Sequence, residues 1–322
     1  MSASSDRVID VVTVGESLGL VVSESVGRLV HSPAMRLGFG GAESNVAIGV
    51  SRLGQSAAWA GRVGADGVGE LIVRELRAEG VQVHAQTDAA ATALMIKERP
   101  RAGESRVTYY RSVQAGSHLV PGDVPEGLVE SARILHVTGI TPALGAGPLS
   151  TVRSAIARAK DAGVLVSFDV NHRSSLWEST SSASDIYRSL VAEADIVFAG
   201  LDEGEIVTGL SSAQEQATAL RELGATCAVI KLGADGAYAV DASGALSRPA
   251  VPVDVVDTVG AGDAFVAGWL SETVRGSSLA VRLQTATACG AFACTAHGDW
   301  EATPTRAELA GFTGPRREPV QR

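Results

Sequence analysis

The runs ILHVTG (134–139), LSTVRSAIARAKDAG (149–163) and VLVSFDV (164–170) follow one another in the chain and indicate the class of fold. The first and third are short, apolar and rich in β-branched residues, which predicts buried strands. The middle run has helical spacing and stops at Gly163. Strand, helix and strand in this order are typical of a βαβ unit, so we expect a parallel sheet covered by helices.

The same alternation continues on both sides of this unit. The predicted strands cover 8–14, 195–200, 227–233 and, as an edge strand of hairpin type, 234–241; the predicted helices cover 44–54, 69–80, 184–194, 213–224, about 263–275 and 279–297. Single helices between strands predict one α/β domain with helices on both faces of a mainly parallel sheet. We assign this domain to residues 1–314 and expect a disordered tail at 315–322.

Residues 92–112, TALMIKERPRAGESRVTYYRS, have a different pattern. Apolar and polar residues alternate more in this stretch, and it carries a turn at 100–103. This pattern predicts a hairpin that stands apart from the main sheet. With the segment near the N-terminus, this hairpin would form a small β lid built from about 17–38 and 92–118. The expected fold class is therefore α/β, with three layers, a mainly parallel central sheet and a β lid.

Composition narrows the class of function. The chain has 322 residues, of which 45% are hydrophobic and 4% aromatic, enough for one large α/β domain. Its net charge is −9, and it has no basic cluster beyond RREPVQR at its end. An acidic chain without a basic stripe is a poor candidate for nucleic-acid binding.

The cysteines and the hydrophobic pattern bear on location. Cys227, Cys289 and Cys294 are odd in number and lie in apolar surroundings without metal-binding spacing, which predicts free thiols in a reducing compartment. The start MSASSDRVID lacks the features of a signal peptide. Because no uninterrupted apolar run reaches about 18 residues, we expect a cytoplasmic protein without a membrane partner.

Residues 257–265 read DTVGAGDAF and place two glycines before an aspartate and an apolar helical stretch. Backbone N–H groups of Gly260, Ala261 and Gly262 at a helix start would form a hole for a phosphate or an oxyanion. Asp263 would repel a phosphate but suits a base that accepts a hydroxyl proton. The combination predicts phosphoryl transfer to an alcohol, and the alternative is a simple helix cap after a glycine turn.

Two long motifs are similar to signatures of the ribokinase/PfkB family of sugar kinases. DTVGAGDAFVAGWL (257–270) resembles the C-terminal signature, and GFGGAESNVAIGVSRLGQSAAWAGRVGADGVG (38–69) resembles the N-terminal one. The two motifs occur in the same order along the chain as the signatures do in the family, and the likeness spans nearly the whole chain. The resemblance implies a ribokinase-like fold, ATP and Mg²⁺ and, in many members, a monovalent cation such as K⁺.

Four further segments resemble 2-keto-3-deoxygluconate kinases, which phosphorylate a keto-deoxy sugar acid at its terminal hydroxyl. They are KERPRAGESRVTYYRSVQAGSHL (97–119), HVTGITPAL (136–144), SFDVNHRSSLW (167–177) and HGDWEATP (297–304). A sugar acid carries a carboxylate, which arginine binds in bidentate fashion. The resemblance carries substrate contacts over to Tyr109, Arg111 and Arg173. The alternative for each arginine is a surface charge or an ordinary ion pair.

Other site positions follow from the resemblance. Gly40 and Gly41 would let the substrate approach the backbone, and Asn45 would bond its hydroxyls unless it caps a helix. The segment KLGADGA (231–237) resembles the family's adenine-nucleotide loop, although it is also an ordinary hairpin turn. Residues expected to contact the nucleotide are Lys231, Gly233, Gly236, Gly260 and Gly262.

Two carboxylates are implied as metal ligands. Glu203 matches the acidic residue of the family's NxxE segment, which helps to hold Mg²⁺ largely through water. Asp257 would bind the monovalent cation together with backbone carbonyls. The alternatives are a solvated helix start for Glu203 and a turn residue for Asp257.

The chain departs from the family pattern at three places. Gly200 stands where NxxE segments begin with asparagine, and Met95 stands where related sugar-acid kinases tend to have a tyrosine. The segment GESLGLVV (15–22) has no aspartate of the kind ribose-type members use, and Glu24 is too far along to replace it. These departures weaken the inferences on magnesium and on the substrate, and they argue against ribokinase itself.

Several functions therefore compete. The leading hypothesis is an ATP-dependent sugar-acid kinase, and the nearest rival is a neutral-sugar kinase of fructokinase type. A non-catalytic sugar or nucleotide sensor has no need of a base at Asp263, and a dinucleotide oxidoreductase would want GxGxxG after the first strand. The lid of this family often pairs between subunits, so we expect a homo-oligomer by resemblance.

Overall fold

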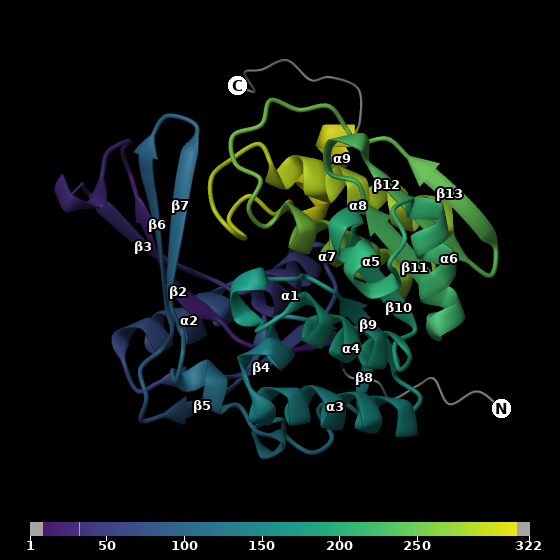
Figure 1. The fold of residues 1–322 in the computed structure, drawn as a ribbon, viewed down its shortest axis with the longest axis horizontal. Coiled ribbons are helices and arrows are strands. Elements are labelled where there is room, and N and C mark those ends of the chain that lie inside the picture. Colours follow the sequence, from purple (N-terminus) through teal and green to yellow (C-terminus); the bar gives the residue numbers. More distant parts are fainter. Residues whose placement is uncertain (1–8, 32, 314–322) are drawn as a thin grey trace.

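The computed structural model describes residues 9–31 and 33–313, so the tail expected at 315–322 lies outside the described residues. A nine-stranded sheet forms the centre, in the order β13-β12-β11-β10-β9-β8-β1-β4-β5 (Figure 1). The strands are β1 (Ile9–Val14), β4 (Ala57–Gly64), β5 (Gln82–Asp88), β8 (Ala132–Thr138), β9 (Leu165–Asp169), β10 (Ile196–Gly200), β11 (Cys227–Lys231), β12 (Ala237–Asp241) and β13 (Gly244–Arg248). Neighbours are parallel except in the pairs β11–β12 and β12–β13.

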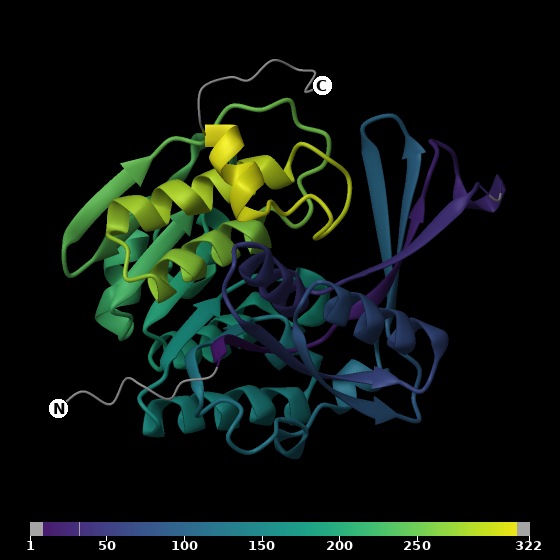
Figure 2. The ribbon, with the colours of Figure 1, turned by 180° about the vertical axis from the view of Figure 1, so that it is seen from behind.

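Helices cover both faces of this sheet. One face carries α3 to α6, and the other carries α1, α2, α7 and α8 (Figures 1 and 2). The helices are α1 (Ala42–Arg52), α2 (Gly67–Ala78), α3 (Ala146–Asp161), α4 (Thr180–Val191), α5 (Leu201–Thr208), α6 (Ala213–Leu223), α7 (Ala261–Val274), α8 (Leu279–Ala293) and α9 (Arg306–Thr313). The prediction of a three-layer fold with a mainly parallel sheet is confirmed.

Each central strand supplies both hydrophobic cores because successive side chains point to opposite faces. Val12 and Val14 of β1 pack into the core with α3 and α4, whereas Val11 packs into the core with α1 and α7. In β8, Leu135 packs into the first of these cores and Ile134 into the second. Strands buried on both faces explain why these segments read as nearly continuous apolar runs.

A second sheet of four strands forms the lid, in the order β3-β2-β6-β7 (Figure 1). Its strands are β2 (Leu18–Ser23), β3 (Met35–Gly40), β6 (Leu94–Arg101) and β7 (Glu104–Tyr110). The pairs β2–β3 and β6–β7 are antiparallel, and the central pair β2–β6 is parallel. The small β lid expected from the sequence is therefore present, with two hairpins joined side by side.

The sequence did not predict the strands β4 and β5. The first, AAWAGRVG, is dominated by small residues, and the second, QVHAQTD, is a largely polar strand at the sheet edge. The helix predicted to 297 ends at Ala293. The three cysteines are free, and no helix in the described ranges is long and apolar enough to cross a membrane.

Candidate active site

A cavity of about 600 Å³, here called the inner cavity, lies between the lid and the ends of β9, β10 and β11. Such a position agrees with the rule that ligands bind at the carboxyl ends of parallel strands. The predicted site residues among its lining are Gly40, Gly41, Asn45, Tyr109, Arg111, Arg173, Glu203, Lys231, Gly233, Gly260, Gly262 and Asp263. Segments from six parts of the chain thus meet at one cavity, whereas Ala261, Gly236 and Asp257 lie outside its lining.

Asp263 lies in the first turn of α7 and faces the inner cavity. Its Oδ2 accepts a hydrogen bond of 2.8 Å from Nδ2 of Asn45. Burial raises the pKa of Asp263, although the bond from Asn45 acts in the opposite direction. A carboxylate that is held in place and has a raised pKa is suited to accept a proton near neutral pH.

Asn45 was expected to bond the substrate, or else to cap a helix. It lies inside α1, whose N-cap is Gly41, so the capping alternative is wrong. The residue is 3% exposed, and its side-chain amide is directed to Asp263. Asn45 therefore orients the candidate base in this structure.

Gly260 makes the turn that leads into α7. It has φ of +73°, a conformation that favours glycine, and it is the N-cap of the helix. A Cβ atom at this position would lie 1.7 Å from the carbonyl oxygen of Asp299. The first N–H groups of a helix lack intrahelical partners, so this helix start can hold an anion. The N–H of Ala261 donates to Thr258 at 3.4 Å and is thus directed into the turn.

Lys231 extends from the end of β11 into the inner cavity. Its Nζ lies 2.7 and 2.8 Å from the two carboxylate oxygens of Asp169, the last residue of β9, which is separated from β11 by β10. Burial raises the pKa of Asp169 to about 6, although Lys231 opposes this shift. Lys231 is therefore already paired, and what it offers a phosphate is a partly neutralised charge.

The predicted nucleotide loop folds as a tight turn between β11 and β12. Gly233 and Gly236 both have positive φ, and Gly233 lines the inner cavity. Gly236 is buried, and a Cβ there would lie 2.0 Å from the carbonyl oxygen of Arg248. The glycine at 236 is thus required by the close approach of backbone segments.

Arg111 follows β7 and forms a buried ion pair with Glu16, which follows β1. The guanidinium also lies over the ring of Tyr109, 5.2 Å from its centroid. Burial raises the pKa of Glu16, and Arg111 opposes that shift. The positive charge expected at Arg111 is therefore countered by a carboxylate that the sequence gave no reason to single out.

Arg173 is exposed at the inner cavity, after the end of β9. Its Nη1 donates to the carbonyl oxygen of His172 at 3.1 Å. Within the described ranges, no carboxylate oxygen lies within ion-pair distance of its guanidinium. Asn171 beside it has φ of +39°, an uncommon conformation for a residue other than glycine, and it lines the same cavity.

Glu203 lies in the first turn of α5 and faces the inner cavity. Its carboxylate accepts hydrogen bonds from the N–H groups of Gly200, at 2.6 Å, and His172, at 2.9 Å. The backbone at Gly200 thus orients Glu203 without the asparagine side chain of the family segment. Over the described part of the chain, no three His, Cys, Asp or Glu side chains are grouped to hold a metal ion.

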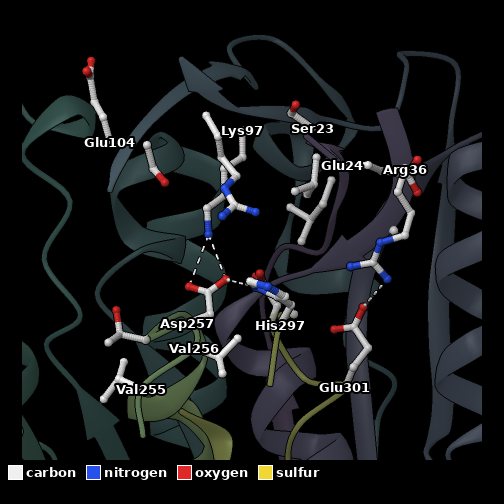
Figure 3. Close-up of a pocket in the computed structure, with 18 of the residues that line it drawn as sticks. Ser23, Glu24, Arg36, Lys97, Glu104, Val255, Val256, Asp257, His297 and Glu301 are labelled. Atoms are coloured by element: carbon white, nitrogen blue, oxygen red, sulfur yellow. Dashed lines mark hydrogen bonds and ion pairs between the residues drawn. The ribbon is translucent and has the colours of Figure 1, made fainter. Parts of the chain in front are cut away.

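A second cavity of about 600 Å³, here called the outer cavity, lies farther out along the lid. It contains Asp257, whose two carboxylate oxygens lie 3.1 and 3.3 Å from Nζ of Lys97 on β6 (Figure 3). Burial acts to raise the pKa of Asp257, but Lys97, together with the N–H of Val259 and His297, lowers it on balance. The residue expected to bind a monovalent cation is therefore paired with a lysine.

Two further residues, Met95 and Asp299, line the inner cavity. Met95 is buried, lines the inner cavity and lies opposite Tyr109 across the β6–β7 pair. Asp299 lines both cavities, and burial, together with Asp263 nearby, raises its pKa to about 7. A Cβ atom on Gly40 would lie 2.4 Å from Oδ2 of Asp299, so the glycine makes room for this carboxylate.

Sequence reasoning missed the partners of the predicted residues. Glu16, Lys97 and Asp299 line the cavities, and Asp169 is paired with Lys231, which lines the inner cavity. Lys97 and Asp299 were inside segments that were quoted only for their likeness to known kinases. Glu16 follows the first strand, the place where an aspartate was sought.

The pfkB family carbohydrate kinase model matches residues 8–306. The chain is 37% identical to a 2-dehydro-3-deoxygluconokinase of Bacillus subtilis (strain 168), over 96% of this chain and 97% of that protein. It is 35% identical to fructokinase-1 of Zea mays, over 93% of this chain and 96% of that one.

A fructokinase double mutant of Vibrio cholerae O395, solved in a form with fructose, ADP and potassium ion bound, has a similar fold. The TM-score is 0.85 at 29% identity, and the likeness covers 96% of this chain and 100% of that chain. The matched family model spans the lid, the central sheet and the loop before α7. The chain belongs to the pfkB family of carbohydrate kinases.

Proposed function

We propose that this kinase transfers the terminal phosphoryl group of ATP to the terminal hydroxyl of a sugar acid of the 2-keto-3-deoxygluconate type. The observation that carries the proposal is the exposed guanidinium of Arg173 at the inner cavity, which has no carboxylate partner in the described chain. An arginine in this state binds a substrate carboxylate in bidentate fashion.

The other cations that line the inner cavity are countered by carboxylates. Lys97 is paired with Asp257, Arg111 with Glu16, and Lys231 with Asp169. In the described residues, Arg173 is the lining cation without a carboxylate at ion-pair distance. Its charge acts to lower the pKa of Asp263 nearby, and its exposed guanidinium is left to meet an anionic substrate. The 37% identity with a 2-dehydro-3-deoxygluconokinase, named for the same sugar acid, supports this choice.

Asp263 would act as the base. It accepts the proton of the substrate hydroxyl while that oxygen attacks the terminal phosphorus of ATP. The new O–P bond forms as the P–O bond to ADP breaks, and the proton ends on the Asp263 carboxylate. Asn45 holds Oδ2 of Asp263 in place at 2.8 Å, so the carboxylate does not have to reorient during transfer.

The start of α7 would stabilise the phosphoryl group in transit. The turn at Gly260 brings the positive end of a 14-residue helix to the inner cavity, where the N–H groups of Gly262 and Asp263 would face the phosphoryl group. Glu203 fits a Mg²⁺ that is bound mainly by water and phosphate oxygens, because the carboxylate is already oriented by two N–H groups. When bound, Mg²⁺ would neutralise charge on the phosphates.

A neutral-sugar kinase is the second candidate, and two observations favour it. Arg111, one of the two arginines expected to meet a carboxylate, is paired with Glu16. Met95 stands opposite Tyr109 and offers no hydrogen-bond donor to a sugar acid. The relationship to fructokinase-1 of Zea mays points the same way.

The test is an ADP-release assay on 2-keto-3-deoxygluconate, fructose and ribose, with the wild type, Arg173→Ala and Arg153→Ala. Arg153 is an exposed arginine on α3, away from the inner cavity, and serves as the matched control. We expect the sugar acid to be the best substrate. Arg173→Ala should raise its KM about 10- to 100-fold, as for the loss of a charged hydrogen-bond pair.

The same assay separates the two candidates. If fructose or ribose gives the highest kcat/KM, the neutral-sugar function replaces the sugar-acid function. If Arg173→Ala leaves the KM of the sugar acid at the wild-type value, Arg173 does not bind the substrate carboxylate and does not select an anionic substrate.

A further inference from the structure

The outer cavity brings one lid lysine against the loop that leads into α7. Figure 3 shows Lys97 directed from the lid toward Asp257, with His297 beside the carboxylate. Nζ of Lys97 lies 3.1 Å from Oδ2 and 3.3 Å from Oδ1. His297 is more distant, with Nδ1 at 3.8 Å from Oδ2, and its side chain is 57% exposed.

This position is the one that the family resemblance assigns to a monovalent cation. The ammonium of a lysine carries the same single charge as K⁺ and is of similar size. Both oxygens of Asp257 already face Nζ, and the two side chains are only 14% and 19% exposed. A K⁺ ion bound to the same oxygens would be repelled by the ammonium at short range. The residues present therefore do not fit a bound monovalent cation beside this pair.

We propose that Lys97 replaces the monovalent cation in this enzyme, so that its activity does not depend on K⁺. The charge needed beside the anion-binding loop is then supplied by the chain itself. It comes from the lid, because Lys97 belongs to β6.

The lysine acts on the loop through Asp257. Oδ1 of Asp257 accepts a hydrogen bond of 3.3 Å from the N–H of Val259, one residue before the turn at Gly260. The backbone N–H groups of Val256 and Asp257 both donate to the carbonyl oxygen of Cys294. Lys97 thus binds the carboxylate of Asp257, and the other contacts of Asp257 fix the loop that leads into α7. Lys97 is therefore a positioning residue.

The same lysine also connects the loop to the substrate side of the lid. Met95 and Lys97 are two residues apart on β6, so their side chains lie on the same face of the strand. Met95 lines the inner cavity, and Lys97 lines both cavities. The positive charge at Asp257 is consequently in place only when the lid lies over the site.

The experiment has two readouts, each in KCl, NaCl and choline chloride at the same ionic strength. The first is the rate of ADP formation with the best sugar, which rests on the proposed function. The second is the Tm of the protein without substrates, which does not. The proteins are the wild type, Lys97→Met, Lys97→Arg, the double variant Lys97→Met/Asp257→Asn, and Arg99→Met.

We expect the wild type to have equal rates in the three salts and no Tm change specific to K⁺. Lys97→Met should be slower in choline chloride by about 10- to 100-fold, because Asp257 loses its partner. KCl should restore part of this rate and raise the Tm by about 2 °C or more, since a cation now binds the folded state. The double variant, which lacks the carboxylate, should lose this response.

Two variants serve as controls. Lys97→Arg keeps the charge and should remain independent of K⁺. Arg99→Met removes a cation two residues along the same strand, at the same cavity, and should also remain independent of K⁺.

A wild-type rate that is several times higher in KCl than in choline chloride would overturn the proposal, and this result needs no variant. A Lys97→Met protein that shows no K⁺-specific change in rate or Tm would overturn it as well. If no sugar is phosphorylated at all, the proposed function fails, and the Tm series still decides whether Lys97 stands in for the cation.

Discussion

Nδ2 of Asn45 donates a hydrogen bond of 2.8 Å to Oδ2 of Asp263, two residues that are 218 positions apart in the chain. The bond joins the first turn of α1 to the first turn of α7. It therefore links the two long sequence motifs that resembled the family signatures. Each motif on its own predicts a helix start; together they place Asp263, the proposed base, beside the side chain that orients it.

Asn45→Ala should shift the pH dependence of turnover. The bond from Asn45 lowers the pKa of Asp263, so its loss raises that pKa and protonates the base at higher pH. The acidic limb of the kcat–pH profile should move to higher pH, and kcat at neutral pH should fall about tenfold. Steady-state ADP release between pH 5 and 9 measures both effects. A profile identical to that of the wild type would mean that Asn45 does not tune the base.

Asp263→Asn should abolish most of the turnover and leave nucleotide binding intact. The amide is the same size as the carboxylate but cannot accept the hydroxyl proton, so we expect kcat to fall by about 10²- to 10⁴-fold. Calorimetric titration with ATP checks that the Kd is kept. Turnover close to the wild-type value would remove Asp263 from the role of base.

Removing either partner of the Glu16–Arg111 pair should destabilise the protein. The two side chains are 1% and 8% exposed, so Arg111→Met leaves a buried carboxylate without its partner, at a cost of about 3–5 kcal/mol. The double variant Glu16→Gln/Arg111→Met removes both charges and should recover much of the loss. Urea unfolding of the wild type, both single variants and the double variant measures the coupling. A double variant no more stable than Arg111→Met would show that the pair is not coupled.

Glu43 should make stability depend on pH. It is fully buried at the start of α1, where Thr138 and Thr141 donate to its Oε1 at 2.8 and 2.7 Å. Burial raises its pKa to about 7 despite these bonds. A raised pKa in the folded state gives stability below the unfolded value of 4.5, and that stability is lost as the pH rises through about 7.

The matching variant is Glu43→Gln, which stays neutral at every pH. At pH 8 it should be more stable than the wild type by up to about 3 kcal/mol, and at pH 4 this advantage should vanish. Urea unfolding of both proteins at the two pH values gives the comparison, and other titrating groups cancel in the difference. An advantage of equal size at both pH values would contradict the assignment to Glu43.

Gly260→Ala should lower both the free energy of unfolding and kcat. Gly209→Ala should lower only the free energy of unfolding, and only slightly. The two glycines have φ of +73° and +76°, so an alanine pays the same conformational cost of about 1 kcal/mol at each. At Gly209 the added Cβ meets nothing within 4 Å, but at Gly260 it meets the carbonyl of Asp299 at 1.7 Å. Urea unfolding and kcat of both variants test this. Equal losses for the two would mean that the contact with Asp299 adjusts freely.

The sequence was sufficient for the strands and helices that carry a strong period. The βαβ run from 134 to 170 and the glycine-stopped helices were predicted because burial on both faces or along one helical stripe leaves a clear pattern. The pattern did not predict β4 and β5, because β4 consists mainly of small residues and β5 is a polar edge strand. Local pattern is weak wherever a strand is not dominated by large apolar side chains.

The candidate site was predicted as a set of residues but not as a set of pairs. Gly260 and Asp263 are neighbours in the chain, so a local motif describes them. The partners of Arg111 and Lys231 come from segments 95 and 62 residues away. A single sequence does not show which carboxylate forms an ion pair with which cation. These ion pairs determine how much uncompensated positive charge the cavity offers to a ligand.

The Glu16–Arg111 pair also has a mechanical consequence. Glu16 lies where the chain first enters the lid, before β2, and Arg111 lies where it leaves the lid for the second time, after β7. Their contact joins two of the four connections between the lid and the rest of the chain. In any rotation of the lid about this contact, each atom travels in proportion to its distance from it, so the turn near Gly103 travels farther than Tyr109. The far end of the β6–β7 hairpin can therefore move while Tyr109, proposed to contact the substrate, stays close to its position.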